Sequence, residues 1–264
     1  MFFNEARRVL VLFYVDDILL MFAKSHRAEA TELLRRIKGT YKIDDKGDVN
    51  WFLGVRVVRN RSLGTVLLLY DTYLDKVAKR FNLKESGRFP ETPLPSGELV
   101  RNPGDASKQD IKAYQERVGS VLYSAIMIRP DVAYAVSQLS QYLTNPSQAH
   151  LDAVEYLIVY LYRSRHKGIT YGGGVRVGDE LQIYGDASFA DDAETRRSSH
   201  GFIVTLFGGP IIWKAARQPT VTTSTTEAEL LALEQIAKET MALRRLFAEL
   251  QLLVTGAWTI FCDN

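Results

Sequence analysis

The sequence predicts an α+β fold in which a helical segment separates two parts that contain β-sheets. Short runs of β-favouring residues alternate with helical patterns near both ends of the 264 residues, and proline-rich and glycine-rich stretches separate them from the middle. With 46% hydrophobic and 24% charged residues, the composition is that of an ordinary globular protein. We therefore divide the chain into three domains, at residues 1–95, 96–175 and 176–264.

Residue usage excludes several classes of protein. No uninterrupted apolar stretch approaches the roughly 18 residues that span a bilayer, and MFFNEARRVL lacks the charged-then-apolar order of a signal peptide. We therefore expect an intracellular protein with no membrane partner. The single Cys262 cannot form an intramolecular disulfide, and the four histidines form no zinc-type cluster, so any metal must be held by carboxylates.

The first part should hold a hairpin, a helix and two further strands. Val9 to Val15 and Ile18 to Phe22 are apolar runs on either side of Asp16 and Asp17, which predicts a buried hairpin with the acids at its tip. The elements expected after it are a helix over Arg27 to Thr40 and strands over Trp51 to Val58 and Thr65 to Tyr70.

Prolines organise the middle part. The stretch from Phe89 to Gly104 holds several prolines and can be neither helix nor central strand, so we expect a linker there. Three short helices should follow, separated by Arg129-Pro130 and Asn145-Pro146. They are expected over Ile111 to Met127, Asp131 to Leu143 and Pro146 to Arg165.

The last part should begin after a flexible joint at Tyr171 to Gly174 and hold three or four strands, a long helix and a final strand parallel to the first. The helix should begin near Thr226, with Ser224 or Thr225 as its cap, and run to about Leu250. The strands are expected over Leu181 to Tyr184, Gly201 to Phe207, Ile211 to Ala215, Pro219 to Thr223 and Ala257 to Cys262.

Two sets of acids are candidates for metal binding. Asp16 and Asp17 place like charges side by side, a cost that divalent cations such as Mg²⁺ would offset. Asp186 and Asp263 each follow a strand of the expected parallel pair, so both can converge with a glutamate of the long helix on a shared cation. Taken without further context, both sets are more often ordinary turn residues.

Helical spacing separates the two glutamates at the start of the long helix. Steps of three or four residues from Glu229 reach Ala232, Ile236 and Leu243, on the face that must pack on the sheet. The same steps from Glu227 reach mainly a solvated face, where an acid in the first turn favours the helix dipole. We therefore choose Glu229 as the metal-binding glutamate, with Glu227 as the alternative.

Longer motifs around these acids resemble a known family. Tyr14-Val15-Asp16-Asp17 resembles the YxDD hairpin of reverse transcriptases, and Trp51-Phe52-Leu53-Gly54-Val55 resembles the primer-grip segment that follows it. The resemblance implies that Asp16 and Asp17 are two of the three metal-binding aspartates of the polymerase. It also implies that the primer end is lined by Phe52, Leu53, Gly54 and Val55.

Four motifs in the last part resemble the successive motifs of copia-type ribonuclease H. They are Tyr184-Gly185-Asp186-Ala187-Ser188, Thr195-Arg196-Arg197-Ser198-Ser199-His200-Gly201-Phe202, Ser224-Thr225-Thr226-Glu227-Ala228-Glu229-Leu230 and Cys262-Asp263-Asn264. The resemblance implies an RNase H fold and cleavage of the RNA strand of RNA:DNA hybrids with Mg²⁺ or Mn²⁺. Asp186, Glu229 and Asp263 would be the catalytic metal ligands, and Arg196 and Arg197 would lie near the hybrid backbone.

The whole chain thus resembles part of a copia-type LTR retrotransposon polyprotein. The three domains would be part of a reverse-transcriptase palm, a helical thumb or connection, and a ribonuclease H-like domain with a mixed sheet. The family has a third polymerase aspartate upstream and a fourth ribonuclease aspartate downstream, so the resemblance implies truncation at both ends.

Two functions follow from this resemblance. In the first, the chain belongs to an RNA-directed DNA polymerase and ribonuclease H that acts on template–primer duplexes and hybrids in cytoplasmic particles, together with other polyprotein segments. In the second, it is a catalytically inactive remnant that at most binds nucleic acid or a partner chain, because fold and ancestry do not guarantee activity when ligands are absent.

Overall fold

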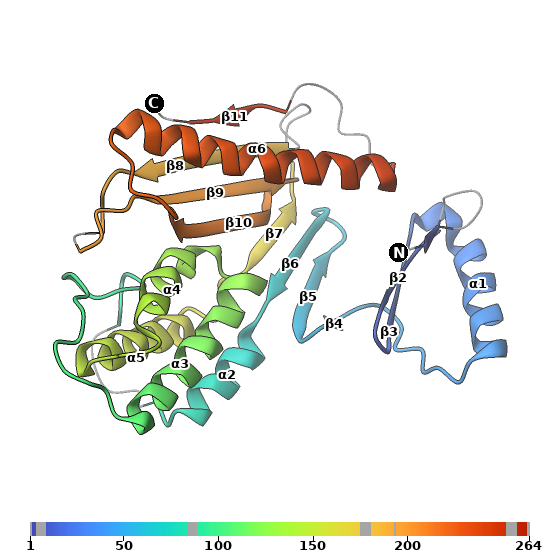
Figure 1. Cartoon of the computed structure of the whole chain (residues 1–264). Helices are drawn as coiled ribbons and strands as arrows, with labels where there is room; N and C mark the ends of the chain where they lie inside the picture. Colours follow the sequence, from blue (N-terminus) through green and yellow to red (C-terminus); the bar gives the residue numbers. More distant parts are fainter. Residues whose placement is uncertain are drawn as a thin grey trace. The chain divides into compact units, whose positions relative to one another are not determined.

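The computed structural model forms two compact units, Met1–Val57 and Val58–Asn264 (Figure 1). It contains helices and several sheets, which confirms the α+β class. No helix in the described part of the chain is long and apolar enough to cross a membrane. The three-domain division expected from the sequence remains a prediction. The structure describes residues 2–3, 9–83, 89–174, 181–192, 194–251 and 258–262.

The first unit contains the expected hairpin and helix. Strands β1 (Phe2–Phe3), β2 (Val9–Tyr14) and β3 (Asp17–Phe22) form an antiparallel sheet in that order. A short 3₁₀ turn, η1 (Lys24–His26), leads into α1 (Arg27–Thr40), whose bounds match the prediction.

Burial of the hairpin is confirmed only in the first part of β2, because Phe22, which pairs with Val9 at the base of β3, is 39% exposed. Val9 and Val11 are 0% and 6% exposed, whereas Phe13 and Tyr14 near the tip are 47% and 55% exposed. The sequence pattern could not show this difference, because an apolar run in the sequence does not say what covers it.

The predicted single strand over Trp51 to Val58 is wrong. Strand β4 (Trp51–Phe52) pairs antiparallel with β5 (Val55–Asn60), which crosses the division between the units. Leu53 and Gly54 both have positive φ, 52° and 78°, as in the two-residue turns that reverse a hairpin. The apolar run therefore folds back on itself instead of continuing as one strand.

The second unit has a helical core. Its helices are α2 (Asp71–Arg80), α3 (Lys108–Met127), α4 (Ala133–Leu139) between the 3₁₀ turns η2 (Pro130–Val132) and η3 (Ser140–Tyr142), and α5 (Gln148–Arg163). The three expected helices are thus confirmed in type and order. Helix α2 was not predicted, although its buried Leu74 and Val77 belong to the same core as α3 and α5.

The proline-rich stretch contains no helix or strand in residues 89–107, as expected of a linker. Hydrogen bonds nevertheless attach it to the helices. The Tyr142 hydroxyl donates to the Leu99 carbonyl at 2.6 Å, and the Asn102 side chain donates to the Pro146 carbonyl at 2.9 Å. Ala106 N–H donates to the Asn145 side chain at 2.8 Å. The stretch is therefore an ordered strap along the helical core.

The predicted flexible joint at Tyr171 to Gly174 is partly wrong, because its first residues form β7 (Ile169–Gly172). This strand pairs antiparallel with β6 (Thr65–Leu69), with Leu68 opposite Ile169. Gly172 has a φ of +84°, and a Cβ there would lie 2.2 Å from the Gly64 carbonyl oxygen. A glycine is therefore required where the two chain segments come closest.

The last sheet has the strand order β10-β9-β8-β11. Strands β8 (Leu181–Ser188), β9 (Ser199–Leu206) and β10 (Gly209–Arg217) are antiparallel, and β11 (Ile260–Phe261) pairs parallel to β8, as expected. One face is covered by α6 (Thr225–Leu250), which contacts β8 and β9 (Figure 1). The strand predicted over Pro219 to Thr223 is absent, since β10 ends at Arg217 and residues 218–224 lead directly into α6.

Candidate functional site

The first candidate acids lie at the tip of the β2–β3 hairpin. Tyr14 pairs with Asp17, so the two-residue turn consists of Val15 and Asp16, and Asp17 is the first residue of β3. Of the two acids expected at the tip, Asp16 thus lies in the turn and Asp17 just after it. Both are exposed.

Val15 is held in an unusual backbone conformation at this tip. Its φ is +51°, and it is 87% exposed. The left-handed region is a genuine outlier for a β-branched residue, and such strain costs about 1–3 kcal/mol and clusters at functional sites. The strained residue immediately precedes the two acids.

The predicted primer-grip residues form the second tight turn of this unit. Phe52 and Leu53 are half-buried, Gly54 is exposed and Val55 is 8% exposed. Leu53 and Gly54 occupy the turn itself, so their backbone groups lie at the surface of the hairpin. Their contact with a primer remains a prediction.

Asp186 lies within β8 and not after it, because the strand extends to Ser188. It pairs with Gly201 of β9. Its neighbour Gly185 faces α6 so closely that a Cβ would lie 1.9 Å from Cδ1 of Ile236. Since successive strand residues point to opposite faces, Asp186 belongs to the face away from α6, where it is exposed.

On that face Asp186 lines a cavity of about 610 Å³. The rings of Tyr184 and Phe261 stack across the parallel strand pair at one side of the cavity, with centroids 5.2 Å apart. Tyr134 of α4 lines the cavity from the helical core. The carboxylate is therefore accessible from solvent beside an aromatic wall.

The two glutamates of α6 occupy different environments. Ser224 Oγ accepts from Glu227 N–H at 3.1 Å, and the Glu227 carboxylate accepts from Thr223 N–H at 2.6 Å and Thr223 Oγ1 at 2.9 Å. The Thr223 backbone and hydroxyl bonds lower the pKa of Glu227. This confirms Ser224 as the cap and places Glu227 in the capping structure of the helix.

Glu229 shares the inner face of α6, as the helical spacing predicts. Ala232, Ile236 and Leu243 on that face are 2%, 1% and 6% exposed, and Glu229 is half-buried above them. Helix α6 runs antiparallel to β8 (Figure 1), so its first turns lie at the carboxyl end of β8. Glu229 and Asp186 thus belong to elements that meet at this end of the sheet, but Glu229 lies on the side that α6 covers and Asp186 on the opposite face.

Asp263, the third predicted ligand, lies outside the described residues. Within the described ranges no three His, Cys, Asp or Glu side chains form a metal-binding group. The neighbouring register is defined, since Ile260 pairs with Ile183 and Phe261 with Tyr184. The metal set chosen from the sequence therefore remains a prediction.

Polar residues not recognised from the sequence connect the loop after β8 to the start of α6. Ser198 Oγ and Thr222 Oγ1 are 2.7 Å apart, and both residues are buried. Gln218, which is 1% exposed, donates from Nε2 to the Ala228 carbonyl at 2.8 Å. In the sequence these residues were marked only by their polarity, and Thr222 lay within the strand predicted over Pro219 to Thr223.

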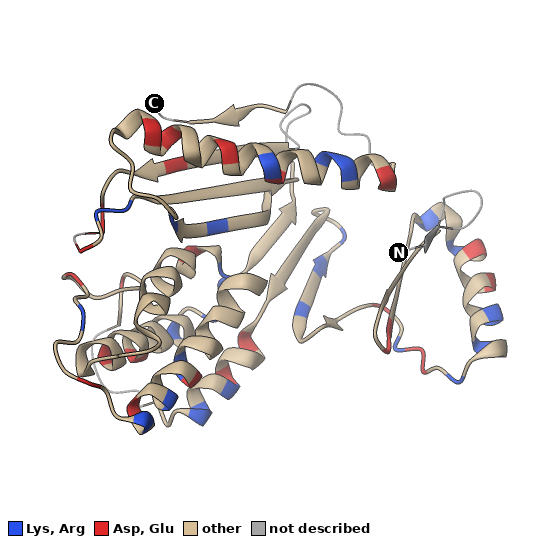
Figure 2. Cartoon of the chain, viewed as in Figure 1, with Lys and Arg blue, Asp and Glu red and all other residues tan. Residues whose placement is uncertain are grey.

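The charges around this end of the sheet are mixed. Figure 2 shows acidic positions in β8 and the first half of α6, and basic positions in the loop between β8 and β9. That loop carries Arg196, which is exposed with a φ of +56°, and Arg197, which is half-buried. The predicted phosphate-binding arginines therefore lie in the connection that leaves β8 after Ser188, close in sequence to Asp186.

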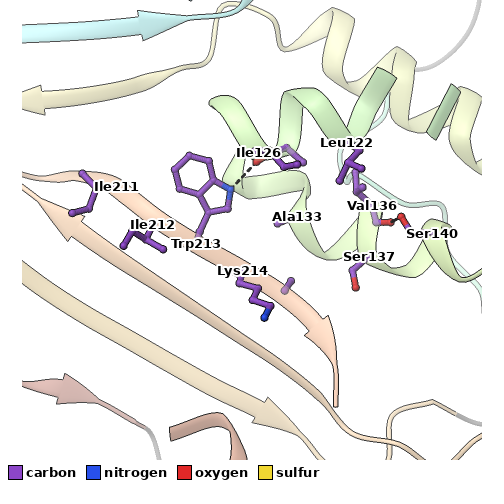
Figure 3. A pocket seen from close by; sticks show the side chains of 12 residues that line it. Leu122, Ile126, Ala133, Val136, Ser137, Ser140, Ile211, Ile212, Trp213 and Lys214 are labelled. Carbon is purple, nitrogen blue, oxygen red and sulfur yellow. Dashed lines mark hydrogen bonds between the residues drawn. The ribbon is translucent and has the colours of Figure 1, made fainter. Parts of the chain in front are cut away.

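A second cavity, of about 410 Å³, lies between α3, α4 and β10 (Figure 3). Trp213 of β10 points into it and donates from Nε1 to the Ala125 carbonyl at 2.7 Å. Its other lining residues are mainly apolar and include Leu122, Ile126 and Val136. None of the predicted site residues lines it, so this cavity belongs to the packing between the helical core and the sheet.

Comparison with known proteins identifies relatives over nearly the whole chain. The chain is 32% identical over 99% of its length to the retrovirus-related Pol polyprotein from transposon TNT 1-94 of Nicotiana tabacum, of which it covers 20%. It is also 32% identical over 97% of its length to the Pol polyprotein from transposon RE1 of Arabidopsis thaliana, of which it covers 17%. The chain thus spans about a fifth of the length of these polyproteins.

A third relative is similar in length to the chain. The uncharacterized mitochondrial protein AtMg00810 of Arabidopsis thaliana is 30% identical over 87% of the chain and 92% of its own length. No protein-family model and no solved structure matches the chain. On the evidence of these relatives, the chain belongs to the family of proteins related to retrotransposon Pol polyproteins.

Proposed function

We propose that the chain is part of a copia-type reverse transcriptase and ribonuclease H, with the nuclease centre at the carboxyl end of β8. The observation that carries the proposal is the parallel pairing of β11 with β8, which sets Phe261 opposite Tyr184. Asp186 follows Tyr184 by two residues, and Asp263 follows Phe261 by two residues. Because each aspartate lies two residues after a member of the same pair, the two aspartates are expected to lie side by side in one site.

The donor set fits a hard divalent cation. Asp186, Glu229 and Asp263 offer only carboxylate oxygens, which Mg²⁺ and Mn²⁺ prefer. Asp186 is exposed at the cavity and Glu229 is half-buried at the first turns of α6. When bound, the metal would generate a nucleophilic water and stabilise the charge on a phosphodiester.

The loop between β8 and β9 would bind the substrate. Arg196 and Arg197 would contact backbone phosphates of an RNA:DNA hybrid. An A-like duplex is recognised mainly through phosphates, 2′-hydroxyls and shape, so we expect weak sequence preference and strong dependence on salt.

The hairpin of the first unit would serve the polymerase reaction of the longer polyprotein. Strain at Val15 beside Asp16 and Asp17 supports a metal-binding tip. The Leu53-Gly54 turn would place backbone groups against the end of the primer strand. Template–primer duplex is the partner expected for these two turns.

The test is cleavage of an RNA:DNA hybrid by the purified chain with Mg²⁺ or Mn²⁺, alongside a binding assay. Asp186→Asn removes one proposed ligand with little change of shape. Asp152→Asn is the matched control, because Asp152 is a surface acid of α5 that bonds the Gln148 side chain. Cleavage by the wild type and by Asp152→Asn, but not by Asp186→Asn, would support the nuclease.

Two other outcomes distinguish the alternatives. Hybrid binding without cleavage by any variant would favour a catalytically inactive remnant that keeps its nucleic-acid surface. A folded chain that neither binds nor cleaves hybrid would contradict the nuclease and leave an inactive remnant without a nucleic-acid surface.

A further inference from the structure

The loop that carries Arg196 and Arg197 is held by an aspartate inside it. One carboxylate oxygen of Asp192 accepts from the backbone N–H groups of Thr195, at 2.8 Å, and Glu194, at 3.1 Å. The backbone of Asp192 also bonds that of Arg196 at 2.8 Å and that of Arg197 at 3.2 Å. Asp192 therefore closes the loop on itself next to both arginines.

The other oxygen of Asp192 ties the loop to the rest of the unit. It forms an ion pair with Arg217, the last residue of β10, and the Asp192 side chain is 13% exposed. The same Arg217 nitrogen donates to the Gln141 side chain of η3 at 2.8 Å. Burial alone would raise the pKa of Asp192, but the Thr195 and Arg217 bonds outweigh burial and lower it. The carboxylate is therefore ionised and partly shielded from water.

A second acid ties the loop to the linker strap. Glu194 forms an ion pair with the Arg101 side chain and accepts from Arg101 N–H at 2.9 Å. Arg101 lies in the strap that runs along the helical core. The loop is thus fixed at one point to the sheet and at another to the strap.

These contacts leave the two remaining arginines unneutralised. The acids nearest to them in the loop, Asp192 and Glu194, are engaged with Arg217 and Arg101. Within the described ranges, the guanidinium groups of Arg196 and Arg197 form no ion pair. Two adjacent positive charges on a fixed loop are suited to neighbouring phosphates of one nucleic-acid strand.

We propose that Asp192 and Glu194 are positioning residues that hold the Arg196–Arg197 loop in the shape that binds the phosphate backbone of nucleic acid. The inference rests on the proposed function, because it needs an RNA:DNA hybrid as the partner. It assigns a role to two acids that would otherwise only repel a polyanion.

Because of that repulsion, the direction in which binding changes distinguishes a positioning role from a simple effect of charge. By charge alone, Asp192→Asn and Glu194→Gln each remove a negative charge near the hybrid and should tighten binding. If the acids position the loop, both substitutions weaken binding instead. The binding constant for an RNA:DNA hybrid is measured across a salt series for the wild type, both variants and Arg196→Ala/Arg197→Ala.

We expect the double arginine variant to reduce the slope of log K against log salt by roughly 1 to 2, since each phosphate contact contributes about 0.7–0.9. Asp192→Asn and Glu194→Gln should reduce the slope in the same direction. Glu234→Gln is the matched control, because it removes one acid from a surface pair with Lys238 on α6, 2.6 Å apart. It should leave the slope unchanged.

Thermal melts check that each variant is folded at the binding temperature. If Asp192→Asn unfolds, Glu194→Gln provides a second test, because Glu194 is exposed. A wild type that binds hybrid, with Asp192→Asn and Glu194→Gln binding as tightly or more tightly, would overturn this inference alone. A folded wild type that does not bind hybrid would overturn the proposed function and this inference together.

Discussion

Gly185→Ala should destabilise the second unit, although alanine is normally the better residue in a strand. Glycine inside a strand costs about 0.5–1 kcal/mol relative to alanine, so alanine without a clash would stabilise. Here the new Cβ would lie 1.9 Å from Cδ1 and 3.2 Å from Cγ1 of Ile236, whereas carbon atoms normally approach to about 3.5–4.0 Å. Ile236 is 1% exposed and cannot turn away freely.

The expected net cost follows from these two effects. Overpacking a well-packed core costs about 1–3 kcal/mol, which exceeds the gain from alanine. We expect the free energy of unfolding to fall by about 1–2 kcal/mol, or roughly 2–8 °C in melting temperature for a unit of this size. Gly185→Ala should therefore lower the urea midpoint that is followed by far-UV circular dichroism.

A second variant identifies the clash as the cause. Ile236→Val removes Cδ1 and should cost about 0.5–1.5 kcal/mol by itself. In the double variant the methyl group introduced at position 185 would occupy the vacated space, so the two costs should not add, with a coupling of about 1 kcal/mol or more. Additive costs, or a stabilised Gly185→Ala protein, would refute the close packing of α6 on β8.

Three further predictions concern polar side chains of the second unit. Burial lowers the pKa of His150 and of His200 below 6.5, so the unfolded chain binds protons more readily than the folded chain. The free energy of unfolding should therefore keep its full value above about pH 6.5 and fall as the pH is lowered below it. Equal urea midpoints at about pH 7.5 and about pH 5.5 would contradict this. Ser224→Ala should cost about 1 kcal/mol by removing the cap of α6, which amide exchange in the first turn would detect as lost protection. Asp131→Ala should cost roughly 3 kcal/mol or more, because Arg129, 2% exposed, would lose its carboxylate partner at 2.7 Å; a melting temperature like that of the wild type would argue against a structural role for the pair.

Sequence-based prediction is most accurate for elements that have a long periodic pattern and a capping residue at their boundary. Helix α6 has an apolar face that repeats over its full length and a serine at its cap, so its bounds and the inward side of Glu229 are both confirmed. The parallel pairing of β11 with β8 follows from the order of strands around the helix. Such features depend on the chain itself more than on its neighbours.

Short elements were missed because their stabilising partners are distant in sequence. Strand β7 looks like a glycine-rich joint until Ile169 is seen to pair with Leu68. Helix α2 is short, and its core partners lie in α3 and α5. The turn at Leu53-Gly54 is hidden in an apolar run, since no residue type marks it as strongly as Asn-Gly would.

The network that fixes the basic loop could not be predicted from the sequence either. Asp192 lies in the connection between two predicted strands and Arg217 follows the end of a third, and solvated charge is the usual interpretation at both positions. Their pairing depends on the register of β9 with β10, which sets Arg217 opposite Ser199. The sequence shows which residues are charged, but only the fold shows which of them form ion pairs.

The pairing of β6 with β7 has a consequence for how the second unit folds and how it can change. Leu68 and Ile169 are neighbours in space, yet the linker strap and helices α2 to α5 lie between them in sequence. The helical core is therefore an insertion whose two ends are held at adjacent positions of one sheet. Closing a loop of about 100 residues is entropically costly, so this pairing should form late, after the helices have condensed. Because the ends stay together, helices can lengthen, shorten or be exchanged in evolution without moving the strands that flank them.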